Sequence, residues 1–248
     1  MKSFLFIALI LSMTFANGQI RKGLQEPAGA WIRGDIREKK IYLCFTAHDF
    51  IEGLPFVIES LRNEKITASF FLTGDFVRNN PDLALVLYQD GHYVGAHSDR
   101  HLLYCDWGKR DSLLVSISEI KKDLDDNVNA LATIGIPRRK TRVFMPPYEW
   151  YNREIAQHIQ SWGYDLVNFT PGTSSNADYT TPDMKNYIGS DTILSRIYNH
   201  ERKDPHHLNG FYLLLHVGTD PKRKDKFYRR LPELIQHLKQ LGYDFARF

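Results

Sequence analysis

Hydrophobic residues along this chain follow two alternating patterns. Short, continuous apolar runs of strand length recur between longer segments whose apolar residues have helical spacing. The runs predicted as strands are 41–46, 67–73, 93–96, 141–145, 164–169, 211–215 and 243–245. The segments predicted as helices are 51–64, 81–90, 111–133, 152–162 and 225–241. Helices alternating with continuously apolar strands indicate an α/β fold, a parallel sheet covered by helices.

This order of elements fits either a β/α barrel or a doubly wound sheet. The sequence contains no glycine-rich phosphate-binding motif and no internal repeat, so it gives no support to nucleotide binding. The segment 170–191 is rich in Ser, Thr, Asn, Asp and Pro and is predicted as a long loop, because strand patterns continue on both sides. We therefore expect a single domain over 41–248, preceded by an N-terminal extension over 19–40.

Residues 1–18 have a different character. They carry Lys2, then the apolar run 4–11, then small and polar residues. This arrangement is typical of a cleavable secretory signal peptide, because the apolar run is too short to cross a bilayer. An uncleaved membrane anchor is the alternative. The signal peptide predicts an exported protein, periplasmic or extracellular, with no membrane insertion after cleavage.

Composition narrows the kinds of site that the chain can build. The 248 residues include two Cys and ten His and carry a formal net charge of +3. Two cysteines exclude a disulfide scaffold and a four-cysteine zinc site, so a metal site must use mainly histidine and carboxylate. Cys44 lies within a strand pattern and is expected to be a buried apolar residue. Acidic and basic residues are interspersed, which gives no strong field to attract nucleic acid.

Polar residues with chemical potential gather directly after the predicted strands. His48 and Asp49 follow the first strand, His97 and His101 follow the third, and His216 follows the run FYLLL. In parallel β/α folds the loops at these strand ends converge on one face. A spacing of four residues can place two imidazoles on one side of a turn, and a carboxylate from another strand would complete a three-donor metal set. The alternative, on spacing alone, is that the two histidines only satisfy the polar groups of a loop.

The segment 41–248 resembles the polysaccharide deacetylases of carbohydrate esterase family four, the NodB-homology domain. The stretches FTAHDF, SFFLTG, HSDRH, VFMPPY and LLLHVG occur in the family's order, and HSDRH matches the family's His-Ser/Thr-x-x-His metal motif residue by residue. The resemblance implies a distorted β/α barrel of about seven parallel strands. It also implies a metal-dependent hydrolase that removes N- or O-acetyl groups from a polysaccharide or oligosaccharide.

The resemblance further implies roles for individual residues. Asp49, His97 and His101 would bind a divalent metal ion, with zinc as the first expectation and cobalt or nickel as alternatives. The other implied site residues are His216 as general acid, Asp178 as its orienting partner, Tyr148 with its backbone N–H toward the oxyanion, and Pro147, Glu149 and Trp150 near the substrate. Exposed aromatic residues such as Trp107 could stack on sugar faces or simply pack against the protein.

Two residues depart from the family's pattern. His48 stands where the family has an Asp that acts as general base, and Met145 stands where the family has an Arg that pairs with this Asp. The two changes are chemically consistent, because a nearby cation would lower the proton affinity of an imidazole. His48 could act as the base, since an imidazole can accept a proton near neutral pH, or become a fourth metal ligand, or mark an inactive site.

The sequence therefore predicts a carbohydrate deacetylase with a glycan substrate. A catalytically weakened or inactive homologue that still binds metal and carbohydrate is the alternative. A different metal-dependent amidohydrolase is a third hypothesis.

Overall fold

The computed structural model describes residues 23–248, so the predicted signal peptide over 1–18 lies outside the described residues. The strands are β1 (Leu24–Gln25), β2 (Trp31–Arg33), β3 (Lys40–Ala47), β4 (Ser69–Leu72), β5 (Tyr93–Ala96), β6 (Val143–Phe144), β7 (Asp165–Leu166), β8 (Phe211–His216) and β9 (Asp244–Ala246). The helices are α1 (Leu54–Glu64), α2 (Gly74–Asn79), α3 (Pro81–Gln89), α4 (Ile117–Thr133), α5 (Arg153–Ser161), α6 (Ser190–Lys203) and α7 (Leu231–Gln240). Within residues 23–248, no helix is long and apolar enough to span a membrane.

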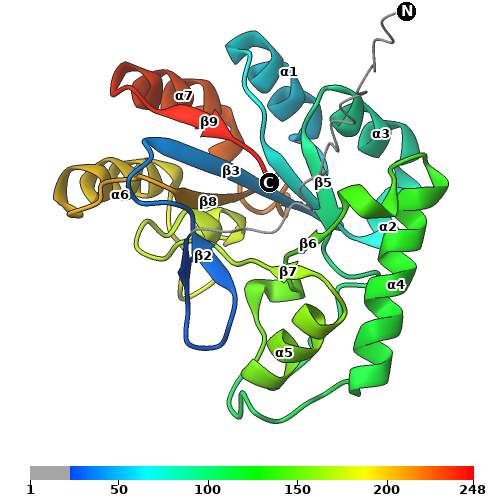
Figure 1. Ribbon diagram of the computed structural model, residues 1–248. Helices are drawn as coiled ribbons and strands as arrows, with labels where there is room; N and C mark the ends of the chain where they lie inside the picture. The colour runs from blue at the N-terminus through cyan, green and yellow to red at the C-terminus, as the bar shows by residue number, and fades with distance from the viewer. Residues whose placement is uncertain (1–22) are drawn as a thin grey trace, which may run out of the picture.

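The strands form one curled sheet with helices around its outside (Figure 1). The strand order is β1, β2, β8, β3, β4, β5, β6 and β7, and β9 pairs with the first residues of β3. Strands β3 to β9 pair in parallel, whereas β1 and β2 run antiparallel to their neighbours. A bridge between Trp31 and Val167 links β2 to the residue that follows β7. The ends of the sheet therefore meet, and the predicted single-domain, distorted β/α barrel is confirmed.

Both faces of the central strands are buried, which explains their continuous apolar sequences. Phe45 and Leu213 pack in the core between the sheet and the helices. Their strand neighbours Cys44 and Leu214 point the other way, into a second cluster that also contains Met145. Cys44 is fully buried and forms no disulfide, which confirms its predicted role as a small apolar residue.

Three predicted helices begin later than their apolar spacing suggests, and the first of them, α1, begins at Leu54 rather than at residue 51. Helix α4 begins at Ile117 rather than at residue 111, because the Ser116 side chain and the Glu119 side chain form a reciprocal capping box. The preceding residues form a loop in which the backbones of Cys105 and Leu113 form an isolated antiparallel β-bridge. Helix α7 begins at Leu231, with proline in its first turn, rather than at residue 225.

Four of the helices and strands in residues 23–248 were not predicted from the sequence, namely β1, β2, α2 and α6. Strands β1 and β2 lie in the N-terminal extension and are only two and three residues long, too short to show a periodic pattern. Helix α6 begins where the predicted loop 170–191 ends, and that loop contains a 3₁₀ turn over Ser175–Tyr179. The extension therefore contributes strands that help to close the barrel.

Candidate active site at the carboxyl ends of the strands

The structure brings the residues singled out from the sequence to one edge of the sheet. His48 follows β3, His97 directly follows β5, and His216 is the last residue of β8. Thr46 of β3 pairs in register with His216, and Ala96 of β5 pairs with Phe144 of β6. Parallel pairing therefore places the loops that follow these strands side by side.

His97 is held in the orientation expected of a metal-binding histidine. Its side chain is buried, and its Nδ1 lies 2.9 Å from the backbone oxygen of Met145. An Nδ1–H that donates to a carbonyl leaves the Nε2 lone pair free to bind a ligand. Burial lowers the pKa of His97 to about 3, so the imidazole is neutral at physiological pH. The backbone N–H of His97 donates to Asn127 of α4 at 2.9 Å.

His101 presents a second neutral imidazole. Its backbone lies in the left-handed region with φ of 55°, and its N–H donates to the Ser98 hydroxyl at 2.9 Å. The ring centroids of His97 and His101 are 5.0 Å apart. Burial lowers the pKa of His101 to about 2. The two neighbouring imidazoles are therefore uncharged and can offer nitrogen lone pairs to a metal ion.

The loop that carries these two histidines packs against the start of α2. The backbone N–H of Gly74 donates to the backbone oxygen of Ser98. The Arg78 guanidinium donates to both carboxylate oxygens of the buried Asp99. A Cβ atom at Gly74 would lie 1.8 Å from a carboxylate oxygen of Asp99, so this close approach requires glycine. Helix α4 supports the loop from its other side, because Asp123 accepts the N–H of Arg100 at 3.2 Å.

His48 lies against His101, with ring centroids 4.7 Å apart and nearly parallel planes. Its Nδ1 is 3.2 Å from the Thr73 hydroxyl, and its Nε2 is 3.3 Å from a carboxylate oxygen of Asp49. The Asp49 side chain is 72% exposed. Among residues 23–248, no three His, Cys, Asp or Glu side chains are gathered closely enough to hold a metal ion. The donor types fit a divalent ion of the zinc class, but within residues 23–248 the Asp49 carboxylate contacts His48 and does not complete a three-donor set with His97 and His101.

His216 is bound to Asp178, the partner that the resemblance implied. Asp178 is buried, its Oδ1 is 2.6 Å from His216 Nδ1, and its Oδ2 accepts the backbone N–H of His216 at 2.9 Å. Burial lowers the pKa of His216, but the Asp178 carboxylate and, less strongly, Glu149 raise it, and the net shift is upward. The Nε2 atom is therefore the nitrogen that can transfer a proton.

The turn over Pro147–Glu149 lies close to both His101 and His216. Tyr148 and Glu149 both have left-handed backbones, with φ of 58° and 52°, a strained conformation that tends to occur at functional sites. The Tyr148 ring is 4.3 Å from that of His101. Burial raises the pKa of the Glu149 carboxyl to about 7; the charge of His216 opposes this rise, and Asp178 adds to it.

The same turn also orients a backbone donor. Its own hydrogen bonds use the N–H groups of Glu149 and Trp150, and the N–H of Tyr148 has no acceptor within the part of the chain that the structure describes. Pro147 is buried, so its contribution is to the shape of the turn. Trp150 is partly buried, and its Nε1 donates to the backbone of Asp106 at 3.3 Å.

Sequence reasoning missed the residue that secures the loop carrying Asp178. Arg223 is fully buried and donates to the backbone oxygens of Thr180 at 2.7 Å, Ile188 at 3.0 Å and Asp225 at 2.6 Å. An arginine in a polar stretch is ordinarily a surface residue, so nothing in the sequence distinguishes it.

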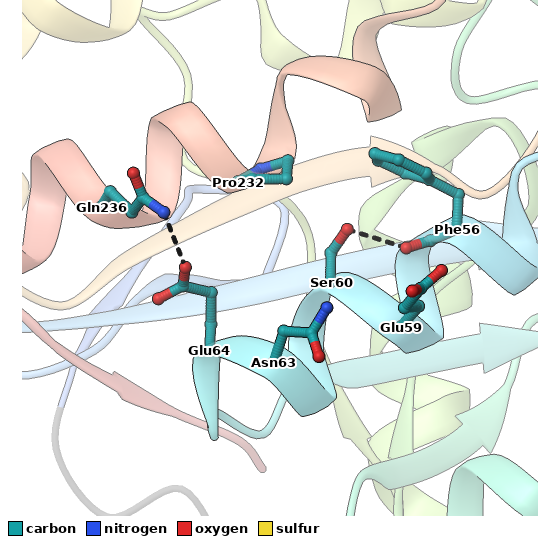
Figure 2. Close-up of a pocket in the computed structure, with 7 residues that line it drawn as sticks. All are labelled: Phe56, Glu59, Ser60, Asn63, Glu64, Pro232 and Gln236. Atoms are coloured by element: carbon teal, nitrogen blue, oxygen red, sulfur yellow. Dashed lines mark hydrogen bonds between the residues drawn. The ribbon is translucent and has the colours of Figure 1, made fainter.

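A groove between α1 and α7 lies apart from this site (Figure 2). Its polar side chains are partly paired within the protein, since Gln236 donates to Glu64 at 3.0 Å and Ser60 donates to the backbone of Phe56 at 2.8 Å. It contains none of the site residues singled out from the sequence.

Known proteins resemble this chain over most of its length. The sequence model of the polysaccharide deacetylase family matches residues 33–167, which include Asp49, His97 and His101 but end before Asp178 and His216. The peptidoglycan-N-acetylmuramic acid deacetylase PdaA of Bacillus subtilis is 26% identical over 229 residues, which are 92% of this chain and 77% of that protein. A peptidoglycan-N-acetylglucosamine deacetylase of Bacillus cereus is 26% identical over 92% of this chain and 94% of its own length.

Solved structures share the fold. The structure of Bacillus subtilis PdaA, a family 4 carbohydrate esterase, superimposes with a TM-score of 0.66 and 25% identity over 89% of this chain and 83% of its own. BA3943 of Bacillus anthracis, described as a pseudoenzyme of the same esterase family, has a TM-score of 0.69 and 22% identity over 90% of this chain and 68% of its own. Because the family's sequence model covers more than half of the residues, this chain belongs to the polysaccharide deacetylase family.

Proposed function

We propose that this protein is a metal-dependent hydrolase that removes acetyl groups from a glycan. The observation that carries the proposal is the placement of two neutral imidazoles, His97 and His101, at the same strand ends as the pair formed by Asp178 and His216. Relatives named as peptidoglycan deacetylases and as a chitooligosaccharide deacetylase support a polymer of N-acetylated hexosamines as the substrate class.

Asp49, His97 and His101 would hold the divalent ion, for which zinc is the first candidate and cobalt and nickel are the alternatives. When bound, such an ion polarises a carbonyl and lowers the pKa of water. The matching donor types and the neutral state of both imidazoles support this assignment.

The remaining steps belong to the chain's own groups. His48 takes a proton from the attacking water, and its position beside His101 supports this role. The backbone N–H of Tyr148 donates to the developing oxyanion. His216 then gives its Nε2 proton to the departing amine or alkoxide, with Asp178 holding the ring and favouring the protonated form. Glu149 and Trp150, which follow Tyr148 on the same turn, would contact the substrate.

A second candidate is a homologue that binds metal and carbohydrate without turnover. It is favoured by His48 and Met145, which replace the Asp and Arg of the family's pattern, and by the exposed Asp49 side chain. The pseudoenzyme BA3943 shares the fold, and one of its mutants is described as having restored enzymatic activity. The predicted signal peptide, together with relatives that act on peptidoglycan, supports an exported location for either candidate.

Acetate release decides between these two functions. The purified protein would be stripped of metal with a chelator, resupplied with zinc, cobalt or nickel, and assayed on acetylated chitooligosaccharides, peptidoglycan and acetylated xylan. We expect release from at least one substrate that depends on added metal and is absent from His101→Ala. Failure to release acetate from any substrate would exclude the enzyme and favour the binding protein.

A further inference from the structure

Three aromatic rings in mutual contact lie beside the candidate active site, and they are here called the aromatic shelf (Trp107, Tyr148 and Trp150). The Tyr148 ring lies 4.3 Å from His101. The Trp107 ring follows at 5.8 Å from Tyr148, and Trp150 lies 5.1 Å from Trp107. The shelf therefore begins at a candidate metal-binding histidine and leads away from it.

The shelf exposes apolar surface that a protein ordinarily buries. Trp107 is 57% exposed and Tyr148 is 44% exposed. Within residues 23–248, the other aromatic residues exposed to a similar degree are Phe50, Phe56 and Tyr179. Of these, Phe50 and Tyr179 also lie on loops at the strand ends. A concentration of exposed rings around one site marks a ligand-binding surface.

Hydrogen bonds hold Trp107 at the tip of its loop. The Asp106 carboxylate accepts the backbone N–H groups of Gly108 at 2.8 Å and Lys109 at 2.7 Å, which forms a tight turn around Trp107. The backbone oxygen of Asp106 accepts the Nε1–H of Trp150 at 3.3 Å. The two tryptophans are therefore linked through the main chain as well as by ring contact.

Arg110 fastens the same loop to the turn that carries Tyr148. Its guanidinium lies 4.3 Å from the ring centre of Trp150, and its Nε donates to the backbone oxygen of Tyr151 at 2.6 Å. The backbone oxygen of Arg110 in turn accepts from Asn152 at 3.0 Å. Because these contacts already order the loop, little conformational entropy is lost when a ligand stacks on the shelf.

We propose that the aromatic shelf is a subsite for a neighbouring sugar of an oligosaccharide, and that it makes longer oligomers bind more tightly. The inference rests on the proposed function, since it takes the acetylated sugar to lie at His101. A pyranose ring has an apolar face of C–H groups and a polar rim of hydroxyl groups. A flat, exposed aromatic side chain can stack on the apolar face and leave the rim in contact with water. A glycan whose acetylated unit lies at His101 can continue over Tyr148 to Trp107, because the rings are contiguous.

Calorimetric titration of the zinc-supplemented protein tests the shelf without requiring turnover. The ligands are N-acetylglucosamine oligomers from the monomer to the hexamer, and soluble glycan strands from peptidoglycan. For the wild type we expect affinity to rise with length. Trp107→Ala should weaken binding of the longer oligomers about tenfold, or about 1.4 kcal/mol, and leave the monomer unchanged. Trp107→Phe should retain most of the affinity, and Phe56→Ala, an exposed ring on α1, should behave as the wild type.

Two results would overturn the proposal: an affinity that does not grow with length in the wild type, or wild-type binding of long oligomers by Trp107→Ala. Acetate release is measured on the same samples. Length-dependent binding through Trp107 without any acetate release would uphold the shelf and refute the deacetylase. Acetate release with the same KM for the hexamer in wild type and Trp107→Ala would uphold the deacetylase and refute the shelf.

Discussion

Asp178 binds His216 at two points, through Oδ1 to the ring Nδ1 at 2.6 Å and through Oδ2 to the backbone N–H at 2.9 Å. The two residues are 38 positions apart and come from different parts of the fold, a 3₁₀ turn in a loop and the end of β8. A single buried carboxylate thus fixes the orientation of the ring and favours its protonated form.

Asp178→Asn should lower the pKa of His216, because the amide lacks the negative charge that counteracts the pKa-lowering effect of burial. If His216 is the general acid, the alkaline limb of the pH–rate profile should move to lower pH, and kcat should fall by about 10²-fold. An NMR titration of the His216 imidazole in both proteins measures the shift directly. An unchanged His216 titration in the variant would contradict this account.

The same pair makes a prediction about stability. The pKa of His216 is raised above its ordinary value of 6.5, so the stabilisation is fully present below that pH and is lost as pH rises through the folded-state pKa. The loss of stability in Asp178→Asn should therefore be larger near about pH 5 than near about pH 9. Urea denaturation at the two pH values tests it, and equal losses would refute it.

His101→Ala and His48→Ala should separate metal binding from proton transfer. His101→Ala removes one of two neighbouring imidazole donors and should abolish stoichiometric zinc binding. His48→Ala should keep the zinc and slow acetate release about 10²-fold, the usual effect of losing a general base. Elemental analysis after dialysis measures the metal, with the exposed His206→Ala as the matched control. Loss of zinc from His48→Ala would identify His48 as a ligand instead.

Glu149→Gln should change how stability depends on pH. The pKa of Glu149 is raised from 4.5 to about 7, so the folded state holds the proton more tightly than the unfolded state does. Wild-type stability should therefore fall as pH rises from 4.5 to about 7, and the variant should escape this loss. We expect the free energy of unfolding of Glu149→Gln to rise by about 2 kcal/mol relative to that of the wild type as the pH is raised from about 5 to about 8. Glu154→Gln, an exposed glutamate on α5, is the control and should show no such gain.

Arg223→Met should destabilise the protein by about 3 kcal/mol, because it leaves three backbone oxygens without their donor. It should also lower kcat more than it raises KM, since the loop it secures carries Asp178. Arg223→Lys should recover part of the stability, and the exposed Arg229→Met should change neither property. If Arg223→Met retained full kcat at a temperature where it is folded, its link to Asp178 would be refuted.

Met145→Arg and His48→Asp restore the family's pair, and their combination tests whether the two positions are coupled. Met145 is fully buried in the apolar cluster that also contains Cys44 and Leu214, so Met145→Arg alone should cost about 3–5 kcal/mol as an unpaired buried charge. Adding His48→Asp should recover part of this cost. A double-mutant cycle by denaturation measures the coupling free energy. Strictly additive effects would show that the two positions act independently here.

The long central strands were readable from the sequence, because burial on both faces of β3 and β8 produces continuous apolar runs. Length alone was not sufficient, since the 14-residue helix α6 was not predicted. Strands β1 and β2 were not readable, since β2 is stabilised by pairing with distant parts of the chain and the two residues of β1 pair with β2. The start of α4 also depended on its neighbours, because residues that continue its apolar spacing are drawn into the loop before Ser116.

The candidate site divides in the same way. Local sequence was enough to predict which polar groups stand at the strand ends, since the succession of strand, turn and helix that positions His48, His97 and His216 is local. The packing of the barrel brings Asp178 to His216, stacks His48 on His101, and buries the arginine that secures the loop. Distances and burial between segments far apart in the chain arise from packing of the whole barrel, and no local pattern of residues encodes them.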